Sequence, residues 1–246
     1  MTAFIPGDDL QLVLTNSELS DTPGFGPDEP SLWFWLQNRR FSIQLKLTNV
    51  EIGYINVQFI NAPKTIDHFF EELDAHSHEL SNFALQVFDQ YGYLKQEVEA
   101  GGLGLWDAED AYKMYVRPMV YIQELVVMES WRSRGVGSWA VPQLFDTHEV
   151  KAIRSSYLFA WPAVLNHLEP MFPQTTTEAC VAKGERVIKF FRSIGFRRLA
   201  NTSFFCLAKD PAHRSRQIAA NEDAEFKTLP PPKDDNEVIR RILASW

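Results

Sequence analysis

The chain has 246 residues, of which 45% are apolar and 13% aromatic, enough for one large domain with a substantial core. Its net charge of −8 disfavours broad binding to nucleic acid or to an acidic membrane surface, so we expect neither partner. No apolar run reaches the length of a membrane span, no basic signal sequence opens the chain, and the two cysteines, Cys180 and Cys206, form no disulfide or metal pattern. These features predict a cytoplasmic protein without a metal site.

The N-terminal part of the chain is predicted to be mostly β. Residues 9–16 read as a first strand, and the stretch 20–30, rich in glycine and proline, reads as a loop. Apolar and polar residues then alternate from Phe41 to Leu47 and again from Gly53 to Phe59. Alternation with a period of two is typical of half-buried strands, so we expect a hairpin here.

A helical segment is predicted to follow this hairpin. Between Ile66 and Leu94 the apolar residues fit a helical stripe that breaks near His76 and His78. Side chains two residues apart on a helix point in different directions, so these histidines are not expected to share a metal. A glycine-rich loop over 99–110 comes next. The helical insertion, about 63–112, therefore precedes the next strand.

The next strand leads into a glycine loop. Met119 to Val127 is an apolar run typical of a buried strand, and the loop and helix "WRSRGVGSWAV" occupy residues 131–141. Glycine allows close backbone approaches, and the first turn of a helix presents unpaired amides at the positive end of its dipole. Such amides can bind a phosphate, with Arg132 and Arg134 adding charge. On these residues alone the loop is either an anion site or a tight turn that binds nothing.

The C-terminal part is predicted to add a strand, a helix and two short strands. Residues 155–164 read as a buried strand, and the helical face from Val187 to Ile194 ends at Gly195. Two short strands with a turn at Asn201 should follow. Residues 213–246 are expected to form a linker and an amphipathic helix, which packs on its own domain, on a protein partner or on a second copy. The apolar side of that helix carries Val238, Ile239, Ile242, Leu243 and Trp246.

Two motifs together resemble one family. Arg132-x-x-Gly135-x-Gly137 is similar to the pyrophosphate-binding signature of the GNAT superfamily of acyl-CoA N-acyltransferases. The stretch "RVIKFFRSIGFRR", residues 186–198, is similar to the aromatic helix ending in Gly-Phe that is the family's second marker. The resemblance implies an α/β domain over 1–212 with a mixed, splayed sheet flanked by helices. It also implies acetyl-CoA or a related acyl-CoA as co-substrate, an amine on a small molecule or peptide as acceptor, and no metal.

The resemblance also implies which residues hold the coenzyme. The main chain of the central strand would contact the pantetheine arm and the acyl carbonyl, and the loop would surround the pyrophosphate. The strand residues are Leu125, Val126 and Val127. The loop residues are Arg132, Ser133, Arg134, Gly135, Val136, Gly137 and Ser138.

Direct transfer needs a base, because an amine with a pKa near 10 must lose a proton before it attacks. Glu124 is the first candidate, since a carboxylate inside an apolar strand is costly unless it is paired or used. His167 is a second candidate on the acceptor side. Phe191 stands where the family's usual proton-donating tyrosine would be, which leaves Tyr157 and Ser193 as substitutes, or a thiolate that departs unassisted. The rival hypotheses are a catalytically silent module of the same fold, which binds acyl-CoA or a protein, and a nucleotide-phosphate binder.

Overall fold

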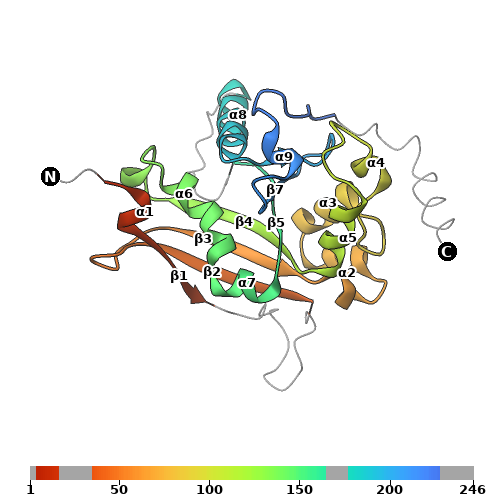
Figure 1. Cartoon of the computed structure of the whole chain (residues 1–246), viewed down its shortest axis with the longest axis horizontal. Coiled ribbons are helices and arrows are strands. Elements are labelled where there is room, and N and C mark those ends of the chain that lie inside the picture. The colour runs from red at the N-terminus through yellow and green to blue at the C-terminus, as the bar shows by residue number, and fades with distance from the viewer. Residues whose placement is uncertain (1–3, 17–34, 165–176, 228–246) are drawn as a thin grey trace, which may run out of the picture.

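The computed structural model describes residues 4–16, 35–164 and 177–227, which fold around one mixed sheet (Figure 1). In the described residues the sheet has seven strands in the order β1-β2-β3-β4-β5-β7-β6, and β4 and β5 form its parallel pair. This confirms the predicted mixed α/β class. The strands are β1 (Leu10–Asn16), β2 (Leu36–Leu45), β3 (Glu51–Ile60), β4 (Met119–Val127), β5 (Tyr157–Ala160), β6 (Arg197–Arg198) and β7 (Phe205–Ala208).

The predicted helical insertion lies between β3 and β4 and gathers at one end of the molecule (Figure 1). Its two main helices separate at the histidines, as expected, because the Ser77 side chain accepts a hydrogen bond from the Leu80 amide and starts a new helix. The insertion consists of a 3-10 turn (Ala62–Thr65), α2 (Phe69–His76), α3 (His78–Val87), α4 (Gln96–Glu99) and α5 (Ala108–Val116). The other helices are α1 (Pro6–Asp9), α6 (Val136–Gln143), α7 (His148–Ile153), α8 (Thr177–Ser193) and α9 (Arg214–Gln217).

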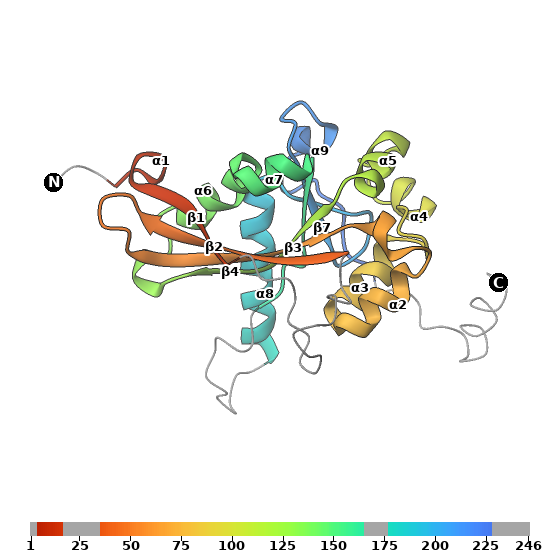
Figure 2. The ribbon, with the colours of Figure 1, turned by 90° about the horizontal axis from the view of Figure 1, so that it is seen from below.

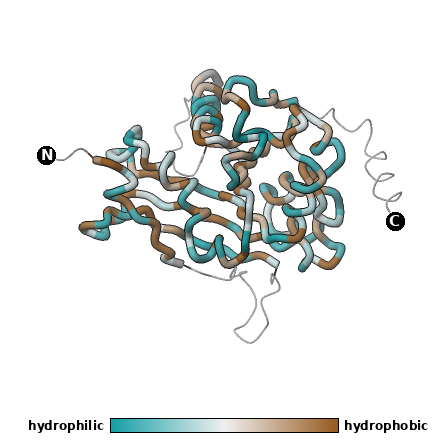
Figure 3. The backbone as a smooth tube through the Cα atoms, in the orientation of Figure 1, coloured by the Kyte–Doolittle hydropathy of each residue, from teal (hydrophilic) through white to brown (hydrophobic). Residues whose placement is uncertain are grey.

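The two faces of the sheet bury two different cores. Tyr121 and Phe159 pack with the insertion helices, on what we call the insertion face. Val120 and Ile122 pack with α6, α7 and α8, on what we call the α6 face. Figure 2 shows α6 and α7 lying along the strands, and Figure 3 shows how apolar residues follow the strands while the loops are largely hydrophilic. Alternation along each strand therefore supplies both cores.

Some local details differ from the sequence-based expectations. Leu47 is 94% exposed, because β2 ends at Leu45 and the chain turns through Asn49 with a φ of 55°. The strand predicted over 155–164 is limited to β5. Pro142 lies near the end of α6, and the chain continues as a 3-10 turn from Leu144 to Asp146. The missing proline N–H accounts for this change of helix type.

Residues beyond the predicted boundary at residue 212 also contact the domain. Ser215 is fully buried, and the Asp223 carboxylate accepts hydrogen bonds from Arg192 Nε (2.8 Å) and the Arg198 amide (3.0 Å). Burial lowers the pKa of Arg198 to about 10, although the charge of Asp223 opposes that shift. Long-range pairing therefore fixes residues 213–227 to the domain, which composition alone could not reveal. His167, the loop 20–30 and the predicted C-terminal helix lie outside the described residues. In the described ranges, no helix is both long and apolar enough to cross a bilayer.

Candidate functional site

Among the residues that the structure describes, the central strand β4 is paired on both sides only in its first half. Residues 120–122 pair with 158–160 of β5, and β5 ends there, whereas pairing with β3 continues to Val127. The side of residues 123–127 that faces away from β3 thus forms what we call the open edge. Burial changes at the same point, since Met119 to Ile122 are buried and Gln123 to Val127 are half-buried or exposed. The pairing of β4 with β5 therefore ends at Ile122.

Main-chain groups point toward this open edge at alternate residues. The Met128 amide donates to the Ile52 carbonyl at 2.9 Å, and a β-carbon added to Gly53 would lie 2.4 Å from the Val126 carbonyl oxygen. Both observations direct the main chain of residues 126 and 128 toward β3. Because direction alternates in an antiparallel pair, the N–H and C=O of Leu125 and Val127 face the open edge. The Val127 carbonyl there accepts from Arg132 Nε at 2.9 Å.

A β-bulge at Gln123 sets the direction of the Glu124 side chain. Ile122 lies opposite Val57 and Glu124 lies opposite Asn56, so Gln123 is an extra residue in β4. Both Ile122 and Leu125 pack on the α6 face, although three positions separate them. The bulge therefore turns Glu124 to the insertion face, beside Tyr121. Without it, regular alternation would direct this carboxylate into the apolar core under α6.

Several polar side chains surround Glu124. Asn56 Nδ2 donates to Glu124 Oε2 at 2.8 Å. Burial raises the pKa of Tyr54, and the charge of Glu124 raises it further. Burial also raises the pKa of Glu79 in α3, and the charge of Glu124 again adds to the increase, while a hydrogen bond from the Tyr121 hydroxyl opposes it. We call these five residues, Tyr54, Asn56, Glu79, Tyr121 and Glu124, the Glu124 cluster.

Sequence reasoning identified only Glu124 in this cluster. The signal for Asn56 and Tyr54 was weak, because they are polar positions in an alternating strand, where solvent exposure is the ordinary expectation. Glu79 follows Ser77 in the first turn of α3, where an acidic residue is favoured by the helix dipole alone. Its position beside β4 depends on long-range contacts, which no local sequence pattern indicates.

The glycine loop has the geometry of a helix start with unpaired amides. Gly135 precedes α6 with a φ of 78°, a left-handed conformation that favours glycine. Within the described part of the chain, the amides of residues 133–138 donate no hydrogen bond, and helical pairing begins with the Trp139 amide on the Gly135 carbonyl. Arg132 and Arg134 are exposed beside these amides. Gly137 also has a packing role, since an added β-carbon would lie 3.1 Å from Phe190 Cζ of α8.

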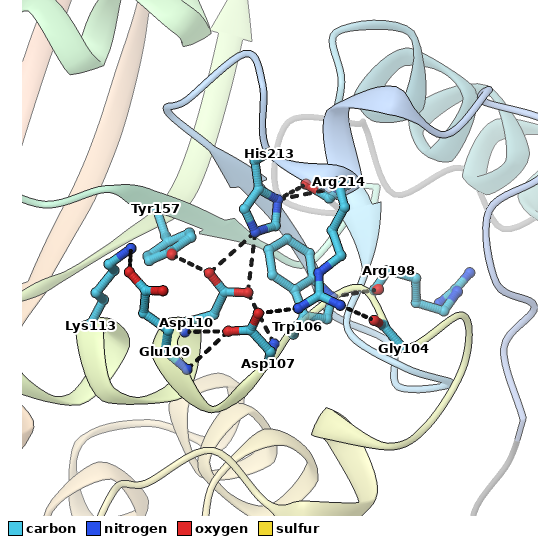
Figure 4. Close-up of polar contacts among 11 residues, drawn as sticks. Gly104, Trp106, Asp107, Glu109, Asp110, Lys113, Tyr157, Arg198, His213 and Arg214 are labelled. Atoms are coloured by element: carbon cyan, nitrogen blue, oxygen red, sulfur yellow. Dashed lines mark hydrogen bonds and ion pairs between the residues drawn. The ribbon is translucent and has the colours of Figure 1, made fainter.

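Tyr157 belongs to a different group of side chains (Figure 4). Its hydroxyl donates to Asp110 Oδ1 at 2.6 Å, and His213 Nε2 lies 3.2 Å from the same carboxylate. Trp106 stacks on His213 with ring centroids 5.3 Å apart. Burial raises the pKa of Tyr157, and its hydrogen bond to Asp110 raises it further. We call Trp106, Asp110, Tyr157, His213 and Ser215 the Asp110 network.

The catalytic candidates are thereby separated. Tyr157 lies three residues before the end of β5, roughly 10 Å along the strand from the point where the pairing of β4 with β5 ends. The Ser193 hydroxyl donates to the Phe190 carbonyl of its own helix at 2.7 Å. Phe191 is 7% exposed and packs on Phe196 with ring centroids 5.1 Å apart. Among the candidates that the structure describes, Glu124 alone lies on the strand that forms the open edge.

The site therefore combines a strand edge, a half-buried carboxylate on the same strand, and a loop flanked by arginines, and the described residues provide no partner for the edge or for the loop amides. In the described ranges, no group of three or more His, Cys, Asp and Glu side chains is arranged to hold a metal ion. The sequence matches no protein-family model and no curated protein.

Proposed function

We propose that the protein is an N-acyltransferase that moves an acyl group from acetyl-CoA, or a related acyl-CoA, to an amine in a ternary complex. One observation carries this proposal. Between Gln123 and Ser138 the chain presents an acidic side chain, a strand edge and a helix start, and neither that edge nor the amides of the helix start have a partner among the described residues. An extended thioester with a charged diphosphate at one end fits this order. The two motifs that resemble the GNAT superfamily support the same conclusion.

The loop supplies the anion-binding part of the site. A diphosphate would accept hydrogen bonds from amides of residues 133–138 and would lie at the positive end of α6. Arg132 is held toward the strand by its hydrogen bond to the Val127 carbonyl, and Arg134 lies over the Trp131 ring, 5.1 Å from its centroid. Both guanidinium groups therefore add positive charge at the end of β4.

The strand edge supplies the part that holds the acyl group. Leu125 and Val127 present main-chain groups to the open edge, where a pantetheine amide can pair as an added strand would. The Val127 N–H is placed to donate to the thioester carbonyl oxygen as negative charge develops there.

Glu124 would act as the base, directly or through a water molecule. It removes a proton from the ammonium form of the acceptor, and the neutral nitrogen attacks the carbonyl carbon. The new C–N bond forms, the C–S bond breaks, and the nitrogen releases its second proton. The electron pair of the broken bond leaves on sulfur as a thiolate, which then takes up one proton to give coenzyme A. A thiol has a pKa near 8.5, well below that of the amine, so the thiolate can depart without a dedicated acid at the Phe191 position.

A catalytically silent module is the second candidate. Phe191 favours it, because a buried phenylalanine stands where the related enzymes carry a proton-donating tyrosine. Such a module would bind acyl-CoA or a protein partner and show no turnover.

Calorimetry and a thiol-release assay test the proposal. Coenzyme A and acetyl-CoA should bind with micromolar affinity and raise the Tm, and thiol should be released from acetyl-CoA when amines are added. ATP serves as the control for a general nucleotide-phosphate site, and equal competition by ATP would favour that alternative. Binding without turnover on any acceptor would favour the silent module. The absence of both heat and thermal shift with coenzyme A would contradict both candidates.

A further inference from the structure

The border of the helical insertion lies beside the Glu124 cluster. Tyr121 and Gln58 are buried beneath the insertion, with 0% and 3% of their surfaces exposed. The next cross-strand pair, Glu124 and Asn56, is only half-buried. The first turn of α3, which carries Glu79, contacts Tyr121 through the hydrogen bond to the Glu79 carboxylate. Glu79 therefore lies at the edge of the insertion, between the buried residues beneath the insertion and the half-buried Glu124.

Glu79 is half-buried without a basic partner. In residues 4–16, 35–164 and 177–227, no lysine, arginine or histidine forms an ion pair with it. The nearby arginine of β2, Arg40, pairs instead with Glu51 at 2.9 Å. A half-buried carboxylate near a second carboxylate is unfavourable unless a cation compensates its charge. The acceptor itself can supply this charge.

We propose that Glu79 is a specificity-determining residue that selects acceptors with a second ammonium group, in the class of aliphatic diamines. The inference rests on the proposed acyl transfer at Glu124. The reacting nitrogen must give up its proton to Glu124 and become neutral, so its charge cannot anchor the acceptor throughout the reaction. A second ammonium group keeps its charge and can pair with Glu79 from binding to transfer. A monoamine of the same length lacks this anchor, and an amino acid of the same length places a carboxylate against Glu79.

The experiment compares three acceptors of matched length, namely 1,4-diaminobutane, n-butylamine and 4-aminobutanoate. Each is titrated by calorimetry into the full chain saturated with coenzyme A, and each is assayed with acetyl-CoA. Wild-type protein should bind and use the diamine at least about tenfold better than butylamine, as expected for one charge-assisted hydrogen bond, and should reject 4-aminobutanoate. Glu79→Gln should remove the preference by weakening diamine binding and raising its KM, with the KM for acetyl-CoA unchanged.

Glu71→Gln is the matched control, because it removes the same charge from an exposed position on the neighbouring helix α2. This variant should keep the diamine preference. The glutamine of Glu79→Gln can still accept from the Tyr121 hydroxyl, and a thermal melt checks its folding. If that variant does not fold, the wild-type comparison of the three acceptors decides alone.

Two results would overturn the inference, namely equal binding of diamine and monoamine by the wild type, or an unchanged diamine preference in Glu79→Gln. Neither result touches coenzyme A binding or acetyl-CoA turnover, on which the proposed function depends. Conversely, failure to bind coenzyme A refutes the proposed function. The same diamine titration on the ligand-free protein then still measures whether Glu79 attracts a dication.

Discussion

The Glu124 cluster and the Asp110 network both place a tyrosine hydroxyl on a carboxylate, but the two carboxylates lie in different parts of the fold. Asp110 is 4% exposed and accepts hydrogen bonds from the Tyr157 hydroxyl and the Asp107 amide, with His213 beside it. His213 Nδ1 accepts from the Ser215 amide, so Nε2 carries the proton that it donates to Asp110. Every polar group of this network has a partner within the fold.

Glu124 lies instead on the second half of β4, which among the described residues pairs with β3 alone. The two carboxylates of the cluster, Glu124 and Glu79, act on each other electrostatically, and the main chain next to Glu124 faces the open edge. A tyrosine beside a carboxylate therefore does not by itself indicate a functional site. A saturated, buried group stabilises the fold, whereas a half-buried carboxylate beside a strand edge that has no partner among the described residues is placed to meet a ligand. Variants in the two regions should consequently have opposite effects.

The largest effect is expected for Glu124→Gln. Removal of the general base should lower kcat by about 10²- to 10⁴-fold, while the change in the free energy of unfolding stays within about 1 kcal/mol. Steady-state assays with the best amine and urea unfolding measure the two quantities. Coenzyme A affinity serves as the control and should not change. A Glu124→Gln protein with wild-type kcat would remove Glu124 from the mechanism.

Asp110→Ala should produce the converse result. It leaves the Tyr157 hydroxyl and His213 without their acceptor in a buried site, which should cost roughly 3–5 kcal/mol of stability. Urea unfolding measures this loss, and Asp74→Ala, at an exposed position of α2, provides the matched control. Below the unfolding transition, coenzyme A should bind with unchanged affinity. A large loss of coenzyme A affinity without a loss of stability would show that the two regions are not separate.

A smaller effect is expected at the glycine loop. Arg134→Ala should weaken coenzyme A binding by about tenfold, because one charge-assisted contact to the diphosphate is lost. Added salt should weaken binding to the wild type more than binding to the variant. Arg117→Ala, an exposed arginine just before β4, is the control and should bind as the wild type does. Equal Kd values for Arg134→Ala and the wild type would indicate that the loop is a plain turn.

The sequence allowed the sheet to be predicted where local pattern determines structure. Alternation between Phe41 and Phe59 predicted the hairpin, and the break at His76 and His78 predicted the start of a second helix. The bulge at Gln123 could not be predicted, because an extra residue in a strand is defined only by the register of that strand with its neighbour. Yet that bulge decides which face Glu124 occupies.

The same limit applies to the separation of the two regions. Tyr157 and Asp110 are 47 positions apart, and Asp110 and His213 are 103 positions apart, so no local pattern connects them. Tyr157 was consequently a reasonable candidate acid on sequence grounds, and the fold places it in the Asp110 network instead. Glu124 was identifiable because a charged residue within an apolar strand is a local anomaly.

The smallest expected effect concerns pH and Glu79. Burial raises the pKa of Glu79 above its ordinary value, and the charge of Glu124 adds to the shift, so ionisation of Glu79 opposes folding. The neutral form of Glu79 therefore stabilises the folded state. This stabilisation is fully present below the ordinary pKa of a glutamate, and it is lost as the pH rises through the higher pKa of the folded state. Glutamine cannot ionise, so Glu79→Gln and the wild type should have similar Tm values near pH 4, and the variant should melt about 2 °C higher near pH 7.

Melts across this range measure the difference, and Glu71→Gln should show none. A Glu79→Gln protein that loses stability relative to the wild type as the pH rises would mean that the ionised carboxylate is already compensated within the fold. Glu79 would then belong with Asp110 rather than with Glu124.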